Sequence, residues 1–442
     1  IYQSLYFFFT KNFVQNISNL SAIKWIKSRF KIFCKMTSAH DFRFLIDKTC
    51  NKWEKTFWST NLVICSCIAS MLIWYSMYLS SDTPTVNIVE SVQYPTYKIP
   101  FPAVTICNVN KISKKAIYAM AKELKNPIPN TTVNDTLDTL NLLRGYIDFK
   151  TDFGENFEDL DTLLAHNNMK IHQVMEKLMP LCSDMIQKCY WRGTEVRCDA
   201  FFQDTLTFFG ACCSFNYLGL KSASQHDNST RTKSSILNQV KLVTTSGPSA
   251  GLIVVLNPLY DDYFYTSYRM TGFRVIIHDS YDFPGTNSPN ILIQDNYATY
   301  LGVMPDYTYS KEEVLTKEIS LRKCYDDSEV DLNVMRRYSY KNCMNECRRL
   351  ITYKLCGCVP YNYPRNGTLP ICNAVENQCI MKNYHLINEA EPQLNISLDF
   401  IHHTYHETTC RCLPACKYFT YSVTPTQSKV RFNQSVRMTE YL

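Results

Sequence analysis

The sequence predicts an α+β membrane protein in which one transmembrane helix precedes a large extracellular domain crosslinked by disulfides. Three observations predict this fold class. The segment 57–79 runs for 23 residues without a charged side chain or a histidine. The chain has 20 cysteines against 12 glycines, a density that persists as disulfides only in an oxidising compartment. Its net charge of +6 comes from the residues that precede the apolar segment.

The apolar segment 57–79, FWSTNLVICSCIASMLIWYSMYL, is long enough to cross a bilayer. Trp58 lies at one end and Trp74, Tyr75 and Tyr78 lie at the other, as expected of aromatic side chains at the two headgroup layers. A buried core helix is the alternative, but such helices seldom extend this far without a charge. A cleaved signal peptide is shorter and lies nearer the N-terminus. The segment therefore predicts a transmembrane helix.

The charge distribution predicts the orientation of this helix. Residues 1–56 contain ten Lys or Arg and three acids, so the totals of 46 and 40 leave 36 basic and 37 acidic residues beyond them. By the positive-inside rule, residues 1–56 form a cytosolic tail and residues 80–442 an extracellular domain of a plasma-membrane protein in contact with lipid. That domain has no basic excess for a nucleic-acid partner. Residues 1–30 fit either a basic aromatic tail on the inner leaflet or a mistranslated upstream fragment.

Six Asn-x-Ser/Thr sequons beyond the apolar segment agree with this topology and predict a glycoprotein. They are Asn130, Asn134, Asn228, Asn366, Asn395 and Asn433. Single sequons arise by chance, but six of them on a cysteine-rich domain favour an extracellular location.

Within the extracellular domain, hydrophobic periodicity predicts both helices and strands and shows no internal repeat. Helical patterns cover residues 114–124, 170–189 and 338–354. The apolar runs LIVVLN at 252–257 and FRVIIH at 273–278 predict buried strands. Two segments, 259–265 and 324–329, mix acids with aromatic residues, and solvated loop acids are favoured there over a cation or proton site.

The cysteines beyond the apolar segment are even in number, which allows complete pairing. They are Cys107, Cys182, Cys189, Cys198, Cys212, Cys213, Cys324, Cys343, Cys347, Cys356, Cys358, Cys372, Cys379, Cys410, Cys412 and Cys416. Cys343 and Cys347 share one face of the predicted helix, and Cys410 and Cys412 share one face of an extended strand. An antiparallel pairing of these faces predicts the disulfides Cys343–Cys412 and Cys347–Cys410. A zinc site is the alternative, and no histidine follows at finger spacing.

Five ordered motifs resemble the epithelial sodium channel and degenerin family, in particular its pickpocket branch. They are FPAVTICN at 101–108, GACCSFNY at 210–217, GFRVIIHDSYDFP at 272–284, YSYKNCMNECRRLITYKLCGCVPYNYP at 338–364 and CRCLPAC at 410–416. Together they cover roughly residues 34–425. The resemblance implies a palm, finger and thumb architecture for the extracellular domain, in which the strand at 101–108 leads from the membrane into the palm.

The resemblance also implies further disulfide pairs. These are Cys107–Cys212, Cys189–Cys198, Cys324–Cys416, Cys356–Cys379 and Cys358–Cys372. Cys182 and Cys213 are left, and we pair them by elimination. A nested set of bonds in the thumb is expected to stiffen a lever between the outer domain and the membrane, with each bond contributing about 2–4 kcal/mol against unfolding.

Two departures from the family pattern bear on function. The family carries a His-Gly gating motif before its first span, and the matching region here contains Ser38, His40 and Asp41. Asp reaches positive φ only at a cost, so we expect a strained or altered turn at Asp41. The chain begins at Ile1 and ends at Leu442 before any second span or Gly-x-Ser filter, so we expect a fragment that lacks the pore-lining second helix.

By resemblance, the chain is expected to be a subunit of a trimeric, sodium-selective, amiloride-sensitive cation channel. Its partners would be identical or related subunits, sodium would be the permeant ion, and neither a cofactor nor a metal site is expected. The alternative is a non-conducting, single-span surface protein that binds a ligand or mediates adhesion. No Gly-x-Ser-x-Gly, His-Glu-x-x-His or nucleotide-loop motif predicts an enzyme. Leu321 occupies the position of a tryptophan found in acid-sensing relatives, so proton gating is not favoured, and the gating stimulus stays open.

Overall fold

The computed structural model describes residues 20–37, 41–82, 85–127, 129–148, 157–221, 239–267, 270–365, 367–388, 410 and 412–430. The chain divides into two compact units, residues 1–87 and residues 88–442. We describe each unit by itself.

The first unit is helical and consists of α2 (Leu20–Met36), α3 (Asp41–Ile46) and α4 (Lys52–Asp82). Helix α4 contains the predicted span 57–79 and extends it at both ends, to 31 residues or roughly 46 Å. Among the described residues, it is the one helix that is long and apolar enough to cross a membrane, and none of its apolar window is buried by protein. Aromatic contacts hold α3 in place, since Phe44 stacks on Trp58 with ring centroids 4.6 Å apart.

The second unit is built on a five-stranded antiparallel sheet with the strand order β10-β9-β1-β6-β5. The strands are β1 (Ala103–Asn108), β5 (Phe202–Thr207), β6 (Gly210–Phe215), β9 (Phe273–His278) and β10 (Asn290–Ile293). Strand β1 lies in the middle, where Ile106 pairs with Cys213 on one side and Val275 on the other. Gly272 precedes β9 with φ near +111°, and a Cβ there would lie 2.1 Å from the carbonyl oxygen of Ile293. Only glycine fits this close approach.

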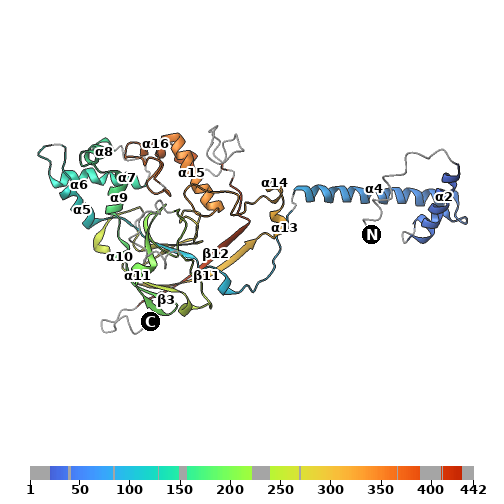
Figure 1. Ribbon diagram of the computed structural model, residues 1–442, viewed down its shortest axis with the longest axis horizontal. Helices are drawn as coiled ribbons and strands as arrows, with labels where there is room; N and C mark the ends of the chain where they lie inside the picture. Colours follow the sequence, from blue (N-terminus) through green and yellow to red (C-terminus); the bar gives the residue numbers. More distant parts are fainter. Residues whose placement is uncertain are drawn as a thin grey trace. The chain divides into compact units, whose positions relative to one another are not determined.

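Three smaller sheets surround the central one. Strands β3 (Ile186–Trp191), β4 (Thr194–Val196) and β7 (Leu252–Leu256) form the first, and β2 (Asn110–Ser113) pairs with β8 (Tyr263–Thr266) in the second. The third is a two-stranded ribbon of β11 (Tyr297–Tyr309) and β12 (Lys417–Lys429). Its strands pair without interruption from Tyr297–Lys429 to Tyr309–Lys417 and run side by side in Figure 1.

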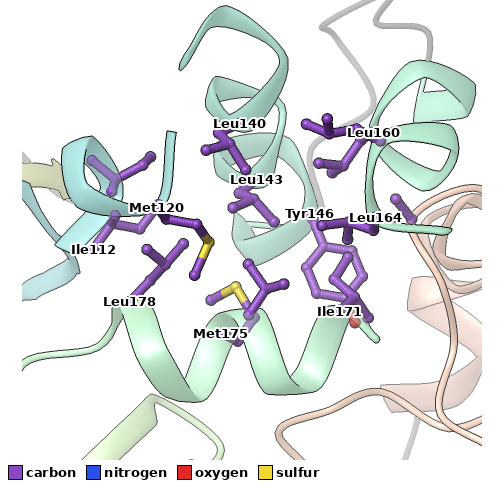
Figure 2. Packing of buried hydrophobic residues seen from close by; sticks show 14 of the residues in the cluster. Ile112, Met120, Leu140, Leu143, Tyr146, Leu160, Leu164, Ile171, Met175 and Leu178 are labelled. Carbon is purple, nitrogen blue, oxygen red and sulfur yellow. The ribbon is translucent and has the colours of Figure 1, made fainter. Parts of the chain in front are cut away.

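Five of the helices that the structure describes between β2 and β3 form an apolar core, which we call the helical cluster. They are α5 (Lys114–Glu123), α6 (Val133–Asn141), α7 (Leu143–Asp148), α8 (Phe157–His166) and α9 (Ile171–Leu178). Figure 2 shows their side chains converging, including Leu140, Leu160 and Met175, each fully buried. Side-chain caps fix two helix starts: Ser113 accepts from the Ala116 amide, and Thr132 and Asp135 form a capping box.

The helix predicted over 170–189 is correct only at its start. Helix α9 ends at Leu178, because Pro180 follows and disfavours helical backbone at the residue before it. One short turn, α10 (Cys182–Met185), separates it from β3, which pairs with β7. The predictions for 114–124, 338–354 and 273–278 are confirmed by α5, α15 (Tyr340–Cys356) and β9. The segment 252–257 forms strand β7 as predicted, but its residues are half-buried and not buried.

The remaining helices are short except for α15. They are α11 (Cys198–Phe201), α13 (Glu312–Leu315), α14 (Ile319–Arg322), α16 (Asn377–Lys382), α17 (Tyr384–Asn388) and the 3-10 turns η1 (Thr96–Lys98), η2 (Pro248–Ala250) and η3 (Tyr260–Asp262). Helix α15 begins at the N-cap Ser339, whose side chain accepts from the Asn342 amide, and ends at Gly357 in left-handed conformation. Two cysteines on α15, Cys343 and Cys347, connect this helix to the chain that leads into β12.

Candidate functional site

The candidate functional site is a continuous path of contacts through the second unit. It begins in the segment that follows α4, passes along the β11–β12 ribbon, and reaches α15 and the turn after β9. The steps of this path are held by aromatic contacts, by disulfides and by polar contacts.

The segment after α4 contacts the ribbon through aromatic and polar side chains. Tyr94 lies 5.7 Å from Tyr307 between ring centroids, and the Tyr309 hydroxyl donates to the Glu90 carboxylate. On the ribbon itself, Tyr307 stacks on Phe419 of the partner strand at 4.4 Å. The segment therefore lies against the same end of the ribbon where β11 ends and β12 begins.

Phe101 fixes the entry of the chain into the central sheet. Its amide donates to the Lys241 carbonyl at 2.8 Å, and its carbonyl accepts from the Asn216 side chain at 2.5 Å. Its ring meets Trp191 edge to face, with centroids 4.9 Å apart. The motif FPAVTICN thus begins with a residue held by both backbone groups and by its ring, and continues directly into β1.

Eight disulfides crosslink the second unit. The pairs are Cys107–Cys212, Cys182–Cys213, Cys189–Cys198, Cys324–Cys416, Cys343–Cys412, Cys347–Cys410, Cys356–Cys379 and Cys358–Cys372. They are the same pairs as those expected from the sequence. Three possible metal ligands approach one another at Cys182, Asp204 and Cys213, but the disulfide occupies both sulfur atoms there, and zinc requires thiolates.

The bond Cys324–Cys416 ties the start of β12 to the loop before α15. It is reinforced by backbone hydrogen bonds in both directions, since the Cys416 amide donates to Tyr325 and the Tyr325 amide donates to Pro414. The next two bonds along the chain, from Cys412 and Cys410, reach α15 at Cys343 and Cys347. We call the set formed by these three bonds the cysteine ladder. It joins α15 and the loop before it to the chain that enters the ribbon.

The turn after β9 is docked on the first turn of α15. The Asn342 side chain accepts from the Phe283 amide and donates to the Tyr281 carbonyl, both at 2.9 Å. Lys341 Nζ lies 3.6 Å from a carboxylate oxygen of Asp282, which is buried. The central sheet and α15 are therefore connected by a polar contact as well as by packing.

His278 lies at the start of this turn and is 1% exposed. Its Nδ1 lies 2.9 Å from the Asp279 carbonyl, and because a carbonyl only accepts, Nδ1 carries the proton. Its Nε2 then accepts from the Thr105 hydroxyl at 2.8 Å, and Thr105 lies 2.7 Å from the Ser214 hydroxyl. Burial of this neutral, fully hydrogen-bonded ring lowers the pKa of His278 to about 4.

Burial also acts on the acid next to His278. It raises the pKa of Asp279 to about 6, and the charge of Asp282 acts in the same direction. The Tyr281 amide, which donates to the Asp279 carboxylate at 2.9 Å, acts against the shift. Asp279 is thus a group of the path whose pKa lies close to neutral pH.

Some of the acids predicted to be solvated loop residues make contacts that hold the fold together. Asp261 is exposed as predicted, but Asp262 is buried, and its carboxylate accepts from the Lys115 amide at the start of α5. Glu329 pairs with the buried Arg322 through both carboxylate oxygens, which lowers the pKa of Glu329. Asp327 accepts from Arg337 at 2.8 Å. The prediction was wrong for Asp262, which is buried, whereas Glu329 is exposed as predicted although it pairs with Arg322. Sequence does not reveal which basic or amide partner an acid meets.

Of the three residues of the predicted gating motif, one falls within the described residues. Ser38 and His40 lie outside the described residues. Asp41 is the first residue of α3, so its backbone is helical and lacks the positive φ of a turn that requires glycine. The strained or altered turn expected around His40 and Asp41 stays a prediction.

Two of the predicted glycosylation sites fall within the described residues. Asn130 and Asn134 are both exposed, and they lie just before α6 and in its first turn. Asn228, Asn366, Asn395 and Asn433 lie outside the described residues.

Known proteins are similar to this chain over most of its length. Residues 33–441 match the family model described as amiloride-sensitive sodium channel. The sodium channel protein Nach of Drosophila melanogaster is 26% identical over 426 residues, covering 94% of this chain and 76% of that protein. Pickpocket protein 11 of Drosophila melanogaster is 25% identical over 413 residues, covering 92% and 62%. The bile acid-sensitive ion channel of Mus musculus is 25% identical over 345 residues, covering 76% and 60%.

Proposed function

Because the chain belongs to the amiloride-sensitive sodium channel family, a family of ion channels and not of enzymes, we propose that it is one subunit of a trimeric, sodium-selective channel that amiloride blocks. Its partners are identical or related subunits, and sodium is the permeant ion. The observation that carries the proposal is the match over residues 33–441, which includes the candidate span, the central sheet and the cysteine ladder. The alternative, a non-conducting surface protein, is not favoured, because the relatives named above are channels.

We propose that α4 crosses the plasma membrane with residues 1–56 in the cytosol, residues 57–79 in the bilayer and residues 80–442 outside. The support is the basic excess before α4 and the exposed apolar surface of that helix. In this arrangement the central sheet is the palm, the helical cluster is the finger, and α15 to α17 with the cysteine ladder form the thumb.

In this proposal, gating is transmitted along the path of contacts described above. A displacement of α15 reaches β12 through the cysteine ladder, because its three disulfides couple α15 and the loop before it to the start of β12. The ribbon then carries the displacement to Tyr94 and Glu90, which lie in the segment after α4. A stiff path of this kind transmits a movement that a loosely packed one would absorb.

The experiment is two-electrode recording from oocytes that express the complete subunit from its transcript, alone and with related subunits. We expect an inward current that disappears when extracellular sodium is replaced by N-methyl-D-glucamine and that amiloride blocks. Uninjected oocytes and oocytes expressing the related subunits alone are the controls. Surface-expressed protein without any sodium-dependent, amiloride-blocked current in either setting would contradict the proposal.

A further inference from the structure

A cavity of about 170 Å³ lies where the end of β1 and strand β9 meet α7 and the β5–β6 turn. It is away from the path of contacts described above. Apolar and aromatic groups form much of its wall, including Phe208, Phe209 and Tyr361. Three charged side chains also line it: Lys111, Asp148 and Arg274.

Lys111 is the group of this cavity that lacks a counter-ion. Its ammonium donates to the Phe209 carbonyl at 2.5 Å and forms no ion pair within the described part of the chain. An ammonium has three N–H donors, so two of them are left for another acceptor. A half-buried ammonium in this situation is costly unless a further partner reaches it.

The other two charges in the cavity are already engaged with the fold. Both carboxylate oxygens of Asp148 accept hydrogen bonds, one from the Tyr265 hydroxyl and one from the Ser267 hydroxyl. The Arg274 guanidinium lies 4.2 Å from the Phe209 ring centroid and donates to Asn290 at 3.2 Å. Two cationic groups and one anionic group give the described lining a net charge of +1.

The surroundings of Lys111 act on its protonation. Burial and the charge of Arg274 of β9 lower the pKa of Lys111 to about 8, and Asp148 of α7 acts in the opposite direction. The phenols of Tyr361 and of Tyr384, which belongs to α17, also face the cavity. An anion at Lys111 would relieve both unfavourable effects, because it supplies the missing opposite charge.

We propose that this cavity binds a small organic carboxylate, whose anionic group pairs with Lys111 and whose ring lies against Phe208 and Phe209. The charge of the lining matches a monoanion, and the aromatic wall matches an apolar body. The size is suitable, since a cavity of roughly 150 Å³ accepts benzene. The proposal does not depend on conduction, so it can fail or succeed independently of the proposed function.

The experiment is binding of 4-fluorobenzoate to the purified complete protein in nanodiscs, measured by fluorine NMR line broadening. We expect saturable binding at about pH 7 and binding weaker by about tenfold or more at about pH 9.5, where the Lys111 ammonium is lost. The neutral 4-fluorobenzamide, which has nearly the same shape, should bind at least about tenfold more weakly. Equal binding of the two compounds, or no saturable binding of either, would overturn the proposal.

Three variants test whether the Lys111 ammonium is responsible for 4-fluorobenzoate binding and for its pH dependence. Lys111→Met should weaken 4-fluorobenzoate binding by about tenfold or more, whereas Lys122→Met, at an exposed position of α5, should leave it unchanged. Lys111→Arg keeps the charge at all pH values used, so it should bind and lose the pH dependence. If Lys111→Met binds like the parent, or if the pH dependence survives in Lys111→Arg, the assignment to Lys111 is wrong.

Discussion

Asp279 and His278 are neighbours in the chain and illustrate how one cause moves two pKa values in opposite directions. Burial disfavours a charge of either sign, so it raises the pKa of Asp279 to about 6 and lowers the pKa of His278 to about 4. Their effects on stability are therefore opposite. The acid contributes stability below the pKa it has when unfolded and loses it as the pH rises through about 6. The imidazole contributes above its unfolded pKa and loses that contribution as the pH falls through about 4.

Replacing Asp279 by asparagine isolates the acid's share of this pH dependence. The amide side chain would keep an oxygen for the Tyr281 amide without a charge to bury. We expect Asp279→Asn to remove the acid's share, a loss of about 1–3 kcal/mol between about pH 4 and pH 7, so that the unfolding free energy of the variant rises with pH relative to that of the parent. Guanidinium unfolding of the purified protein across this range measures it.

A matched control for this variant is Asp261→Asn, at an exposed position outside the turn. That change should leave the pH dependence of the unfolding free energy as it is in the parent. If Asp279→Asn and Asp261→Asn give the same curve as the parent, Asp279 is not held at a raised pKa.

Two of the disulfide pairs could be predicted from spacing and the others only through the resemblance or by elimination, whereas the partners of buried polar residues could not be predicted. Helical spacing indicates the shared face of Cys343 and Cys347, and strand spacing indicates that of Cys410 and Cys412. Asn342 lies next to Cys343, but nothing in its sequence context indicates that it binds the turn after β9. A hydrogen bond between residues 59 positions apart depends on the tertiary arrangement. No local pattern encodes it.

At the scale of elements, segments with strong periodicity and clear ends were predictable. Strand β9 is a short apolar run that follows a glycine, and α15 is bounded by Ser339 and Gly357. The error over 170–189 arose because apolar residues continue at helical spacing beyond Pro180. There, pairing of β3 with β7 outweighs helix propensity.

The cysteine ladder makes a direct prediction for mass spectrometry. Non-reducing peptide mapping should recover peptides that join the region of Cys343 and Cys347 to that of Cys410 and Cys412. Removing one disulfide of the ladder with the double variant Cys343→Ala, Cys412→Ala should lower the free energy of unfolding by about 2–4 kcal/mol. The reason is that this disulfide closes a long loop in the unfolded chain. Free thiols at these four positions in the native protein would show that the ladder does not form.

The contact of Tyr94 with the ribbon makes a prediction for channel activity. In the channel proposed above, Tyr94→Ala removes the ring that meets Tyr307 and should lower the current by several-fold at equal surface expression. Tyr94→Phe retains the ring and should behave like the parent, as should Tyr118→Ala on an exposed face of α5. Oocyte recording with surface biotinylation measures both quantities. An unchanged current in Tyr94→Ala would remove this contact from the path of transmission.

At the scale of the whole molecule, the proposed topology makes a prediction for glycosylation. Expression in a secretory cell should give a mass increase that peptide-N-glycosidase removes, and the double variant Asn130→Gln, Asn134→Gln should reduce that increase. Asparagine is the better residue to change, because Thr132 of the first sequon also caps α6. Protein that reaches the surface with no enzyme-sensitive mass would place residues 80–442 on the wrong side of the membrane.

The strand order of the second unit was not predictable from the sequence. Composition and charge predict a membrane helix and a crosslinked domain, but not which strands become neighbours. The central order β10-β9-β1-β6-β5 brings together three widely separated stretches of sequence. Residues 297–309 show no sign that their partner lies in 417–429. Such long-range pairing leaves no period in the sequence.

The pairing of the β11–β12 ribbon also sets an order of events during biosynthesis. Met304 and Ser422 face each other although they are 118 residues apart, so β11 leaves the ribosome many seconds before its partner exists. During that interval its backbone groups are unpaired and its tyrosines are exposed, which is the condition under which strands of different chains join wrongly. Oxidative folding of α15 and its loops brings the start of β12 back to β11. In the topology proposed above, closure of the ribbon therefore follows formation of the cysteine ladder, which requires the oxidising lumen of the secretory pathway.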